Sequence, residues 1–198
     1  SDMIIGNLID AYILNVSTST DISIEMSSGW NWFSFNVEGE SLDINSVLAT
    51  VDQGIFVKSQ SAYADYYSSF DTWYGTLTNM DVTQTYKLNM GSNTDVLEYS
   101  GMPVDPSIPI PLSTGWNWIG YLPSASLEIN AALGSVSNGI FIKSQSEYAD
   151  YYDSFDTWYG TMAAMSPYGG YQLNMSAADE LVYPGNVQTS AELNPLLS

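Results

Sequence analysis

The chain contains no cysteine, no histidine and no arginine, and these absences exclude whole classes of chemistry. Without cysteine there is no thiolate nucleophile, no disulfide and no Cys/His zinc site, and without histidine there is no imidazole base. Positive charge is also scarce, because three lysines stand against 22 acidic residues and give a formal net charge of −19. Such a charge repels phosphate backbones and anionic lipid surfaces. We therefore expect neither nucleic acid nor a membrane as a partner.

Long hydrophobic runs are absent as well, since no segment approaches the roughly 18 apolar residues that span a bilayer. The first residues, Ser1-Asp2-Met3, resemble residues left over from an expression vector and not the start of a signal peptide. We therefore expect a soluble excerpt of a longer protein. High acidity with many Ser, Thr, Asn and Tyr residues is common in secreted bacterial modules. The expected location is therefore extracellular, secreted or at the cell surface, and no cofactor is expected.

What the chain does contain is a duplication. Gly54–Thr76 and Gly139–Thr161 share 23-residue segments that differ only at Val57/Ile142, Ala62/Glu147 and Ser68/Asp153. Outside these segments the copies have diverged further, although Trp30 still aligns with Trp116 and Tyr86 with Tyr171. The repeat is therefore a whole folding unit, and its uneven similarity indicates a local constraint on the shared segment.

Alternating apolar residues predict that each copy is mainly β. Strands are expected around 22–26, 55–60, 62–67, 72–77, 86–90 and 97–99, with counterparts in the second copy. One short helix per copy is expected over Ser41–Val51 and Ser126–Val136, with the serines as N-caps. The predicted fold is mainly β (α+β): two tandem small antiparallel β modules, each with one short helix, of the β-sandwich kind.

The repeat boundaries predict five parts. These are an N-terminal extension (1–21), a first module (22–101), a linker (102–107), a second module (108–185) and a C-terminal tail (186–198). Met102–Pro111 holds four prolines and is expected to be a stiff connector. Within the extension, Ala11–Val16 is a candidate edge strand, and the composition of the tail leaves a short helix and a disordered segment open.

The segments Gly29–Phe35 and Gly115–Tyr121 open with Gly-Trp-Asn-Trp. Together with the later Tyr86-Lys87-Leu88 and Gly170–Leu173 strands, each closed by a final strand at Gly101 or Gly185, they resemble an extracellular Gly-Trp-Asn repeat module of bacterial and archaeal secreted and surface proteins. The resemblance implies a repeated accessory part and places Trp30 and Trp116 in the core. The first copy departs from the pattern at Thr85, where a glycine is expected.

The shared segment carries the candidate ligand-binding residues. Alternation places Tyr63, Asp65 and Tyr67 on one strand face, and aromatic rings beside carboxylates and amides suit the C–H faces and hydroxyls of a sugar. We expect an exposed shallow groove in each copy. The candidates are Lys58, Gln60, Tyr63, Asp65, Tyr67 and Trp73, and in the second copy Lys143, Gln145, Tyr148, Asp150, Tyr152 and Trp158.

Plainer interpretations remain open for the same residues. The aromatic rings could fill the core of a small β domain, and each lysine could pair with a carboxylate such as Asp65 or Asp71. Trp32 and Trp118 could face a ligand, or the other copy. The Asp65/Asp71 pair could serve a glycosidase, but a module this small offers no deep cleft, and no Asp-x-Asp-x-Asp-Gly calcium loop exists.

Two functions therefore compete. The favoured one is a non-catalytic extracellular binding module, most simply for a polysaccharide or glycan, with one site per repeat and no metal. The alternative is a structural, spacer or adhesion repeat of a bacterial cell-surface protein that binds no small ligand. Neighbouring domains of a larger secreted protein are further possible partners.

Overall fold

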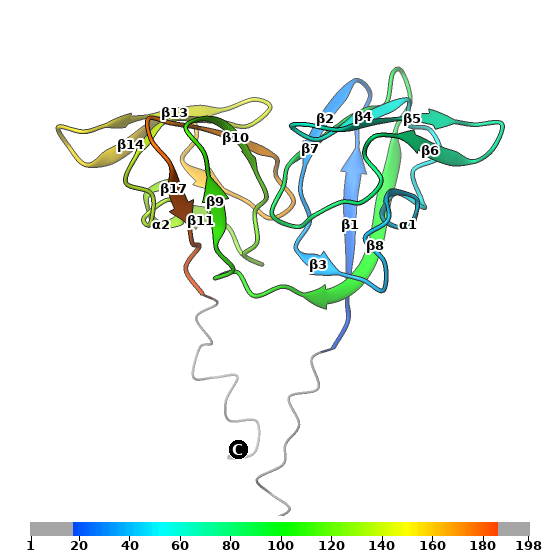
Figure 1. Cartoon of the computed structure of the whole chain (residues 1–198), viewed down its shortest axis with the longest axis horizontal. Coiled ribbons are helices and arrows are strands. Elements are labelled where there is room, and N and C mark those ends of the chain that lie inside the picture. The colour runs from blue at the N-terminus through cyan, green and yellow to red at the C-terminus, as the bar shows by residue number, and fades with distance from the viewer. Residues whose placement is uncertain (1–17, 186–198) are drawn as a thin grey trace, which may run out of the picture.

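The computed structural model describes residues 18–185, which form two similar β units side by side (Figure 1). The chain is mainly β, with antiparallel sheets and two short helices, as the sequence predicts. Ala11–Val16 and the tail at 186–198 lie outside the described residues. Within the described part, no helix is long and apolar enough to cross a membrane.

The first copy is built from two sheets and one helical turn. Its elements are β1 (Thr20–Met26), β2 (Trp30–Phe33), β3 (Val37–Glu38), α1 (Ile44–Val47), β4 (Phe56–Lys58), β5 (Tyr63–Tyr67), β6 (Thr72–Gly75), β7 (Tyr86–Asn89) and β8 (Asp95–Pro103). A five-stranded sheet has the order β2-β7-β4-β5-β6, and a three-stranded sheet has the order β1-β8-β3.

The second copy repeats this plan, but its smaller sheets have two strands each where the first copy has a sheet of three. Its elements are β9 (Ile110–Leu112), β10 (Gly115–Ile119), β11 (Leu127–Glu128), α2 (Ile129–Ala132), β12 (Gly139–Lys143), β13 (Tyr148–Tyr152), β14 (Thr157–Gly160), β15 (Ala164–Met165), β16 (Tyr171–Met175) and β17 (Asp179–Leu181). The five-stranded sheet again reads β10-β16-β12-β13-β14, and β11-β15 and β17-β9 are two-stranded.

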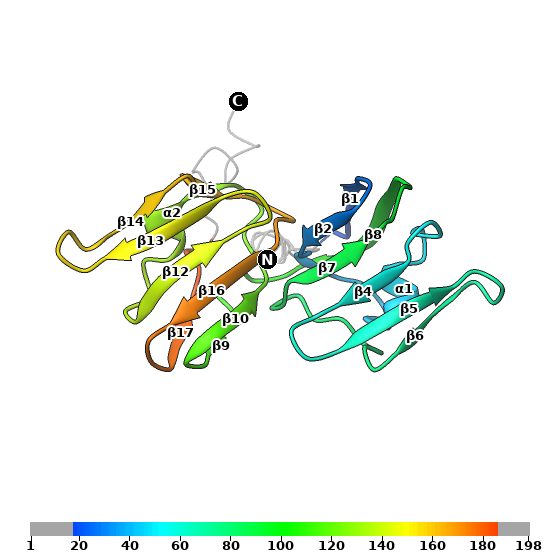
Figure 2. The same ribbon diagram turned by 90° about the horizontal axis from the view of Figure 1, so that it is seen from above.

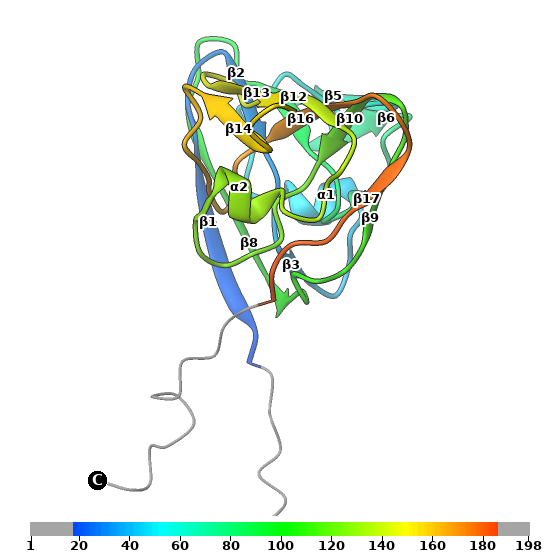
Figure 3. The ribbon, with the colours of Figure 1, turned by 90° about the vertical axis from the view of Figure 1, so that its left-hand side faces the viewer.

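Alternation along the strands explains which face of each five-stranded sheet is buried. Val57, Ala64 and Leu88 lie opposite one another in the register and are fully buried, and Ile142, Ala149 and Leu173 repeat this in the second copy. Their neighbours along each strand point the other way. The apolar inner face packs on the lower strands and the helix, which Figure 3 shows beneath the sheets. We call the opposite, solvent-facing side of both sheets the outer face.

The Gly-Trp-Asn motif forms the tight turn that starts this sheet. Gly29 and Gly115 have φ values of 81° and 88°, in the left-handed region that glycine adopts without strain. The Asn31 amide closes the turn, because its Nδ2 donates to Ser27 O at 2.7 Å and its Oδ1 accepts from Ser27 N at 2.9 Å. Asn117 makes the same two bonds to Ser113. The glycine and the asparagine of the motif are thus explained by local geometry.

The expected helices are longer than the observed ones. Each is a single turn, with Asp43 and Glu128 in place of Ser41 and Ser126 as N-caps. Asp43 accepts from Asn45 N, and Glu128 accepts from Asn130 N and Ala131 N. Within these turns Asn45 and Asn130 direct their side-chain amides to the edge strands β6 and β14, where Oδ1 accepts from Trp73 N at 2.7 Å and from Trp158 N at 2.6 Å.

The proline-rich connector is also shorter than expected, because β8 runs through Pro103 and β9 begins at Ile110. Pro103 pairs only with β3, and Pro111 lies in a two-stranded ribbon opposite Glu180. Both prolines therefore occupy positions where a missing N–H leaves no ladder bond unmade. Val104 N, at the start of the remaining link, donates to Asn36 O at 3.0 Å.

Seen from above, the two five-stranded sheets lie next to each other, with the β5–β6 and β13–β14 hairpins at opposite ends (Figure 2). Backbone bonds join the copies: Ser34 N donates to Tyr168 O at 3.0 Å, and Gly120 N donates to Thr83 O at 2.8 Å. These four residues occupy equivalent positions in the two copies. The contact is thus close to a two-fold arrangement within one chain.

Candidate functional site

The outer face carries the same row of side chains in each copy. In the first copy Trp30, Asn89, Phe56, Asp65 and Tyr74 lie directly opposite one another across all five strands. The second copy places Trp116, Asn174, Phe141, Asp150 and Tyr159 in the corresponding row. Rings along the row contact each other edge to face, as Trp30 and Phe56 do at 6.2 Å between centroids. The outer face is therefore an aromatic surface with amide and carboxylate groups between the rings.

Tyr63 and Tyr148 flank this row, as alternation predicts. Each ring stacks on its neighbour, Tyr63 on Phe56 and Tyr148 on Phe141, with centroids 5.8 Å apart in both pairs. Both tyrosines are nearly half exposed. Stacking holds the rings in place without covering them.

Gln60 and Gln145 bridge the two copies. Gln60 Nε2 donates to Trp116 O at 2.8 Å, and its Oε1 accepts from Trp118 N at 2.8 Å. Gln145 makes the equivalent bonds to Trp30 O and Trp32 N at 2.6 and 2.8 Å. Each side-chain amide thus replaces a neighbouring strand at the exposed edge of the other copy. Both ends of these amides are used by the protein itself.

All three lysines of the chain gather where the copies meet. Lys87 Nζ lies 3.3 Å from the ring centroid of Trp32 and 4.4 Å from that of Trp118, so it sits between one indole of each copy. Lys58 faces Trp30 at 5.4 Å and Lys143 faces Trp116 at 4.6 Å. We call these residues the central cluster: Lys58, Lys87, Lys143, Trp30, Trp32, Trp116 and Trp118.

The central cluster overturns two expectations. Trp30 and Trp116 are 40% and 42% exposed and lie on the outer face, so their expected place in the core is wrong; buried positions belong to residues such as Leu88 on the neighbouring strand β7. Within residues 18–185, no carboxylate forms an ion pair with a lysine of the cluster, so the expected pairing of Lys58 with Asp65 or Asp71 is wrong too. Asp65 faces Phe56 across the strands, and Asp71 accepts a hydrogen bond from Tyr66 Oη at 2.6 Å.

The electrostatics of the cluster follow from this geometry. Burial and, to a smaller extent, the positive charges of Lys58 and Lys143 together lower the pKa of Lys87 to about 8. Lys87 Nζ does find one polar partner, since Gln172 Oε1 accepts from it at 2.9 Å and from Trp118 Nε1 at 2.7 Å with the amide oriented to satisfy both donors. The ammonium groups are thus close enough to repel one another.

The copies differ at the contact between them. Ser34 corresponds to Gly120, Thr85 to Gly170 and Lys87 to Gln172. Ser34 Oγ donates to Gly169 O at 2.7 Å, and Thr85 Oγ1 donates to Ile119 O at 2.6 Å. A Cβ atom on Gly120 would lie 2.0 Å from Val82 O, and one on Gly170 would lie 2.6 Å from Trp32 C. Thr85, the departure from the repeat pattern, is therefore a specific partner for the second copy.

Each hairpin end holds a small aromatic cleft. The two clefts, which we call the terminal clefts, have volumes of about 320 and 370 Å³. The first is lined by Tyr67, Phe70, Thr72 and Tyr74, and the second by Tyr152, Phe155, Thr157 and Tyr159. Asp71 and Asp156 follow the exposed phenylalanines and adopt φ values of 49° and 50°, which close the hairpin turns.

Of the residues expected to line an exposed groove, the tyrosines are exposed and the tryptophans are not, and only Tyr67 and Tyr152 line a terminal cleft. Trp73 and Trp158 are only 4% exposed, because the register turns them to the inner face beside Tyr66 and Tyr151. Tyr74 and Tyr159, the next residues, are 73% and 72% exposed. Period-two counting from Tyr67 reaches Trp73, whereas the hairpin register pairs Tyr67 with Thr72 and Asp65 with Tyr74, which puts Tyr74 on the exposed face. The third lysine, Lys87, carried no sequence signal beyond its rarity.

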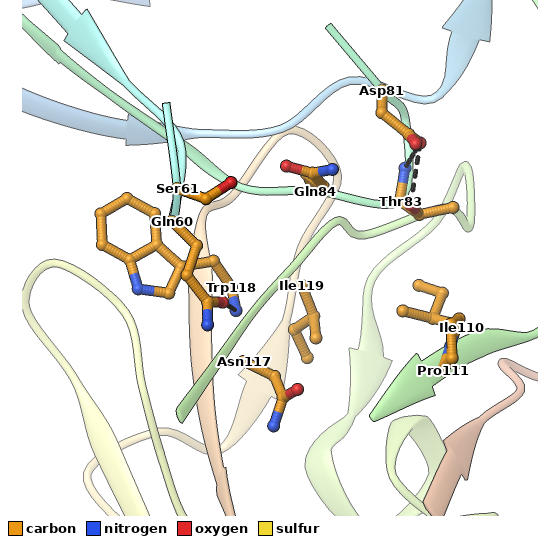
Figure 4. A pocket seen from close by; sticks show the side chains of 10 residues that line it. All are labelled: Gln60, Ser61, Asp81, Thr83, Gln84, Ile110, Pro111, Asn117, Trp118 and Ile119. Atoms are coloured by element: carbon orange, nitrogen blue, oxygen red, sulfur yellow. Dashed lines mark hydrogen bonds between the residues drawn. The ribbon is translucent and has the colours of Figure 1, made fainter. Parts of the chain in front are cut away.

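A further cleft of about 400 Å³ lies between the copies (Figure 4). Gln60, Ser61 and the segment Asp81–Gln84 face Asn117, Trp118 and Ile119 of the second copy across it. Two of its polar side chains are already paired: Asp81 Oδ1 accepts from Thr83 N and Oγ1 at 2.8 Å, and Asn117 closes its own turn. Among the described residues, no group of three or more acidic side chains could hold a metal ion.

Comparison of the chain with protein-family models, with curated proteins and with solved structures found no match. The functional argument therefore depends on the geometry of the outer face.

Proposed function

We propose that this protein is a non-catalytic extracellular carbohydrate-binding module, secreted or at the cell surface, that binds a polysaccharide along its outer face. The observation that carries the proposal is the duplicated aromatic cleft, lined at each end of the molecule by two tyrosines, a phenylalanine and a threonine. Exposed rings offer flat surfaces to the C–H faces of sugars, and phenol, threonine, aspartate and asparagine groups beside them can bond hydroxyls.

The arrangement suits a long ligand better than a single sugar. The aromatic row crosses every strand of each five-stranded sheet. Open aromatic surfaces bind extended chains because each residue of the chain adds a small contact of its own. The chain's net charge of −19 favours neutral polysaccharides over polyanions of high charge density.

A structural, spacer or adhesion repeat without a small ligand is the second candidate, and one observation favours it. Gln60, Gln145, Trp73 and Trp158 belong to the near-identical segment, yet they serve contact between the copies or core packing. No ligand is needed to explain why these residues are the same in both copies. Phe70 and Tyr74 are also unchanged in the second copy, but they are more than 70% exposed, so packing does not explain their identity.

Affinity electrophoresis in gels containing soluble β-glucan, mannan or xylan tests the proposal. The intact chain should be retarded by at least one of them. Replacing Tyr74→Ala and Tyr159→Ala together should abolish the retardation, and either one alone should weaken it at least about tenfold through lost avidity. The matched control is the pair Ile55→Ala and Ile140→Ala, two exposed apolar residues outside the aromatic row. No retardation of the intact chain in any gel would favour the structural repeat.

A further inference from the structure

The central cluster places every positive side chain of the described protein at one point of an otherwise acidic molecule. The lysines come from three separate strands, β4, β7 and β12, and from both copies. Their register fixes the arrangement, because Lys58 lies directly opposite Lys87 on the neighbouring strand and Lys143 opposite Gln172. Neither copy alone assembles the cluster.

Contact between the copies does not account for these charges. Three ammonium groups repel one another, and burial of Lys87 adds to the cost of its charge. A carboxylate within the cluster would offset both effects, and the chain has 22 acidic residues to draw on. In the described residues none of them pairs with the three lysines. The positive charge is therefore left for a group that comes from outside.

The indoles around the lysines indicate what kind of group it is. Trp30 and Trp116 stand beside Lys58 and Lys143 with about two fifths of their surface exposed. Ring faces next to ammonium groups suit a ligand that is flat and apolar on one side and anionic at one edge. A pyranose with a carboxylate has this chemistry, whereas a bare inorganic anion would use only the lysines.

We propose that the central cluster is a subsite for a uronate residue of the bound glycan, with the lysine ammonium groups receiving its carboxylate and the exposed indoles packing against its ring. This inference rests on the proposed carbohydrate function. It assigns one uronate-binding position at the centre of the outer face, between two aromatic rows that would bind neutral sugars. Because Asp65 and Asp150 lie in those rows, a densely charged polyuronate is a poorer ligand than a largely neutral glycan with isolated uronates.

The six tryptophans make the test specific. Four belong to the central cluster, and Trp73 and Trp158 lie buried beneath the sheets as internal controls. In proton–nitrogen correlation spectra of the full chain, titration with sodium glucuronate should shift the indole signals of the central cluster and leave those of Trp73 and Trp158 in place. Glucose at the same concentrations should cause much smaller shifts, and acetate should bind at least about tenfold more weakly than glucuronate.

Substitutions separate charge from packing. Lys58→Met with Lys143→Met keeps side-chain length, removes two charges and should weaken glucuronate binding at least about tenfold. Lys143→Arg should retain binding. Equal shifts with glucose, or unchanged binding in the double methionine variant, would overturn the carboxylate subsite. Acetate binding as tight as glucuronate would overturn the role of the sugar ring.

Failure of this inference is distinguishable from failure of the proposed function. Retardation in neutral polysaccharide gels with no response to glucuronate overturns the uronate subsite and leaves carbohydrate binding standing. Absence of both overturns both.

Discussion

Some residues at the middle of the outer face differ between the two copies, whereas the residues that line the clefts at its ends are identical. At the hairpin ends the terminal clefts use identical residue types in both copies, as in Tyr67/Tyr152 and Tyr74/Tyr159. At the middle some equivalent positions differ, with Ser34 against Gly120 and Thr85 against Gly170, although Gln60 and Gln145 are the same. Identity is expected where both copies do the same work, and difference where they must fit each other.

The difference at the middle teaches that the copies are not interchangeable. A hydroxyl of the first copy lies where the second copy has only glycine, and Lys87 meets Gln172 in place of another lysine. Two first copies would bring two Lys87 ammonium groups together and crowd the hydroxyls. The contact therefore specifies one pairing, first copy with second copy, by the same logic that separates specific from non-specific partners.

Making the middle symmetrical should have the largest effect on stability. Gly120→Ser with Gly170→Thr gives the second copy the residues of the first, and the new Cβ atoms would collide with backbone atoms at 2.0 and 2.6 Å. We expect a loss of about 3 to 6 kcal/mol in the free energy of unfolding, measured by urea denaturation. Gly185→Ala, where a Cβ meets nothing within 4 Å, is the control and should be neutral. A wild-type midpoint in the double variant would refute the complementary fit.

At the ends, neighbouring residues should give opposite results. Trp73→Ala empties a packed position against Gly54 and Tyr66 and should cost about 3 to 5 kcal/mol of stability. Tyr74→Ala removes an exposed ring and should leave stability within about 0.5 kcal/mol of the wild type while weakening polysaccharide retention. If Trp73→Ala left the thermal midpoint unchanged, the assignment of this ring to the core would be wrong.

The smallest effect concerns pH and the charge at the middle. The pKa of Lys87 is about 8 in the fold and 10.5 ordinarily, so above about pH 8 the unfolded state holds more protons than the folded state. Stability should therefore rise between about pH 8 and 10, by less than about 1 kcal/mol because solvent screens this partly exposed group. Lys87→Gln should abolish the rise.

Above about pH 10 the sign reverses. The pKa of Tyr66 is raised to about 12, because its hydroxyl donates a hydrogen bond to the Asp71 carboxylate. Burial raises the pKa of Tyr86. Unfolded tyrosines ionise first, near their ordinary value of 10.0, and stability falls from there. Urea midpoints that declined steadily from pH 8 upward would contradict the lowered pKa of Lys87.

The sequence predicts the strand pattern because alternation reports local burial. Val57, Ala64 and Leu88 alternate with polar or aromatic neighbours, and the strands lie where this period places them. The resemblance to the repeat module places Trp30 in the core, and only the strand register shows that it faces outward. The helices are shorter than the sequence predicts, and the contact of the Asn45 side chain with β6, a strand 27 residues later, could not be predicted from the local sequence.

The candidate site was predictable in part for a similar reason. Tyr63, Asp65 and Tyr67 share a face within one strand, so their grouping needed no tertiary information. The contacts of Gln60 with Trp118, 58 residues away, and of Lys87 with two indoles depend on how the copies meet. A repeat read as two separate modules could not reveal residues whose partners lie in the other copy.

The contacts of Gln60 and Gln145 between the two copies have a consequence for the length of the ligand. Because Gln60 and Gln145 tie each copy to the strand edge of the other, the terminal clefts keep a fixed separation and a fixed mutual orientation. A stiff polymer whose repeat matches that separation would occupy both clefts with little further loss of entropy, while an oligosaccharide too short to reach would gain nothing from the second. The protein would then select its ligands by the length of their repeat as well as by their chemistry.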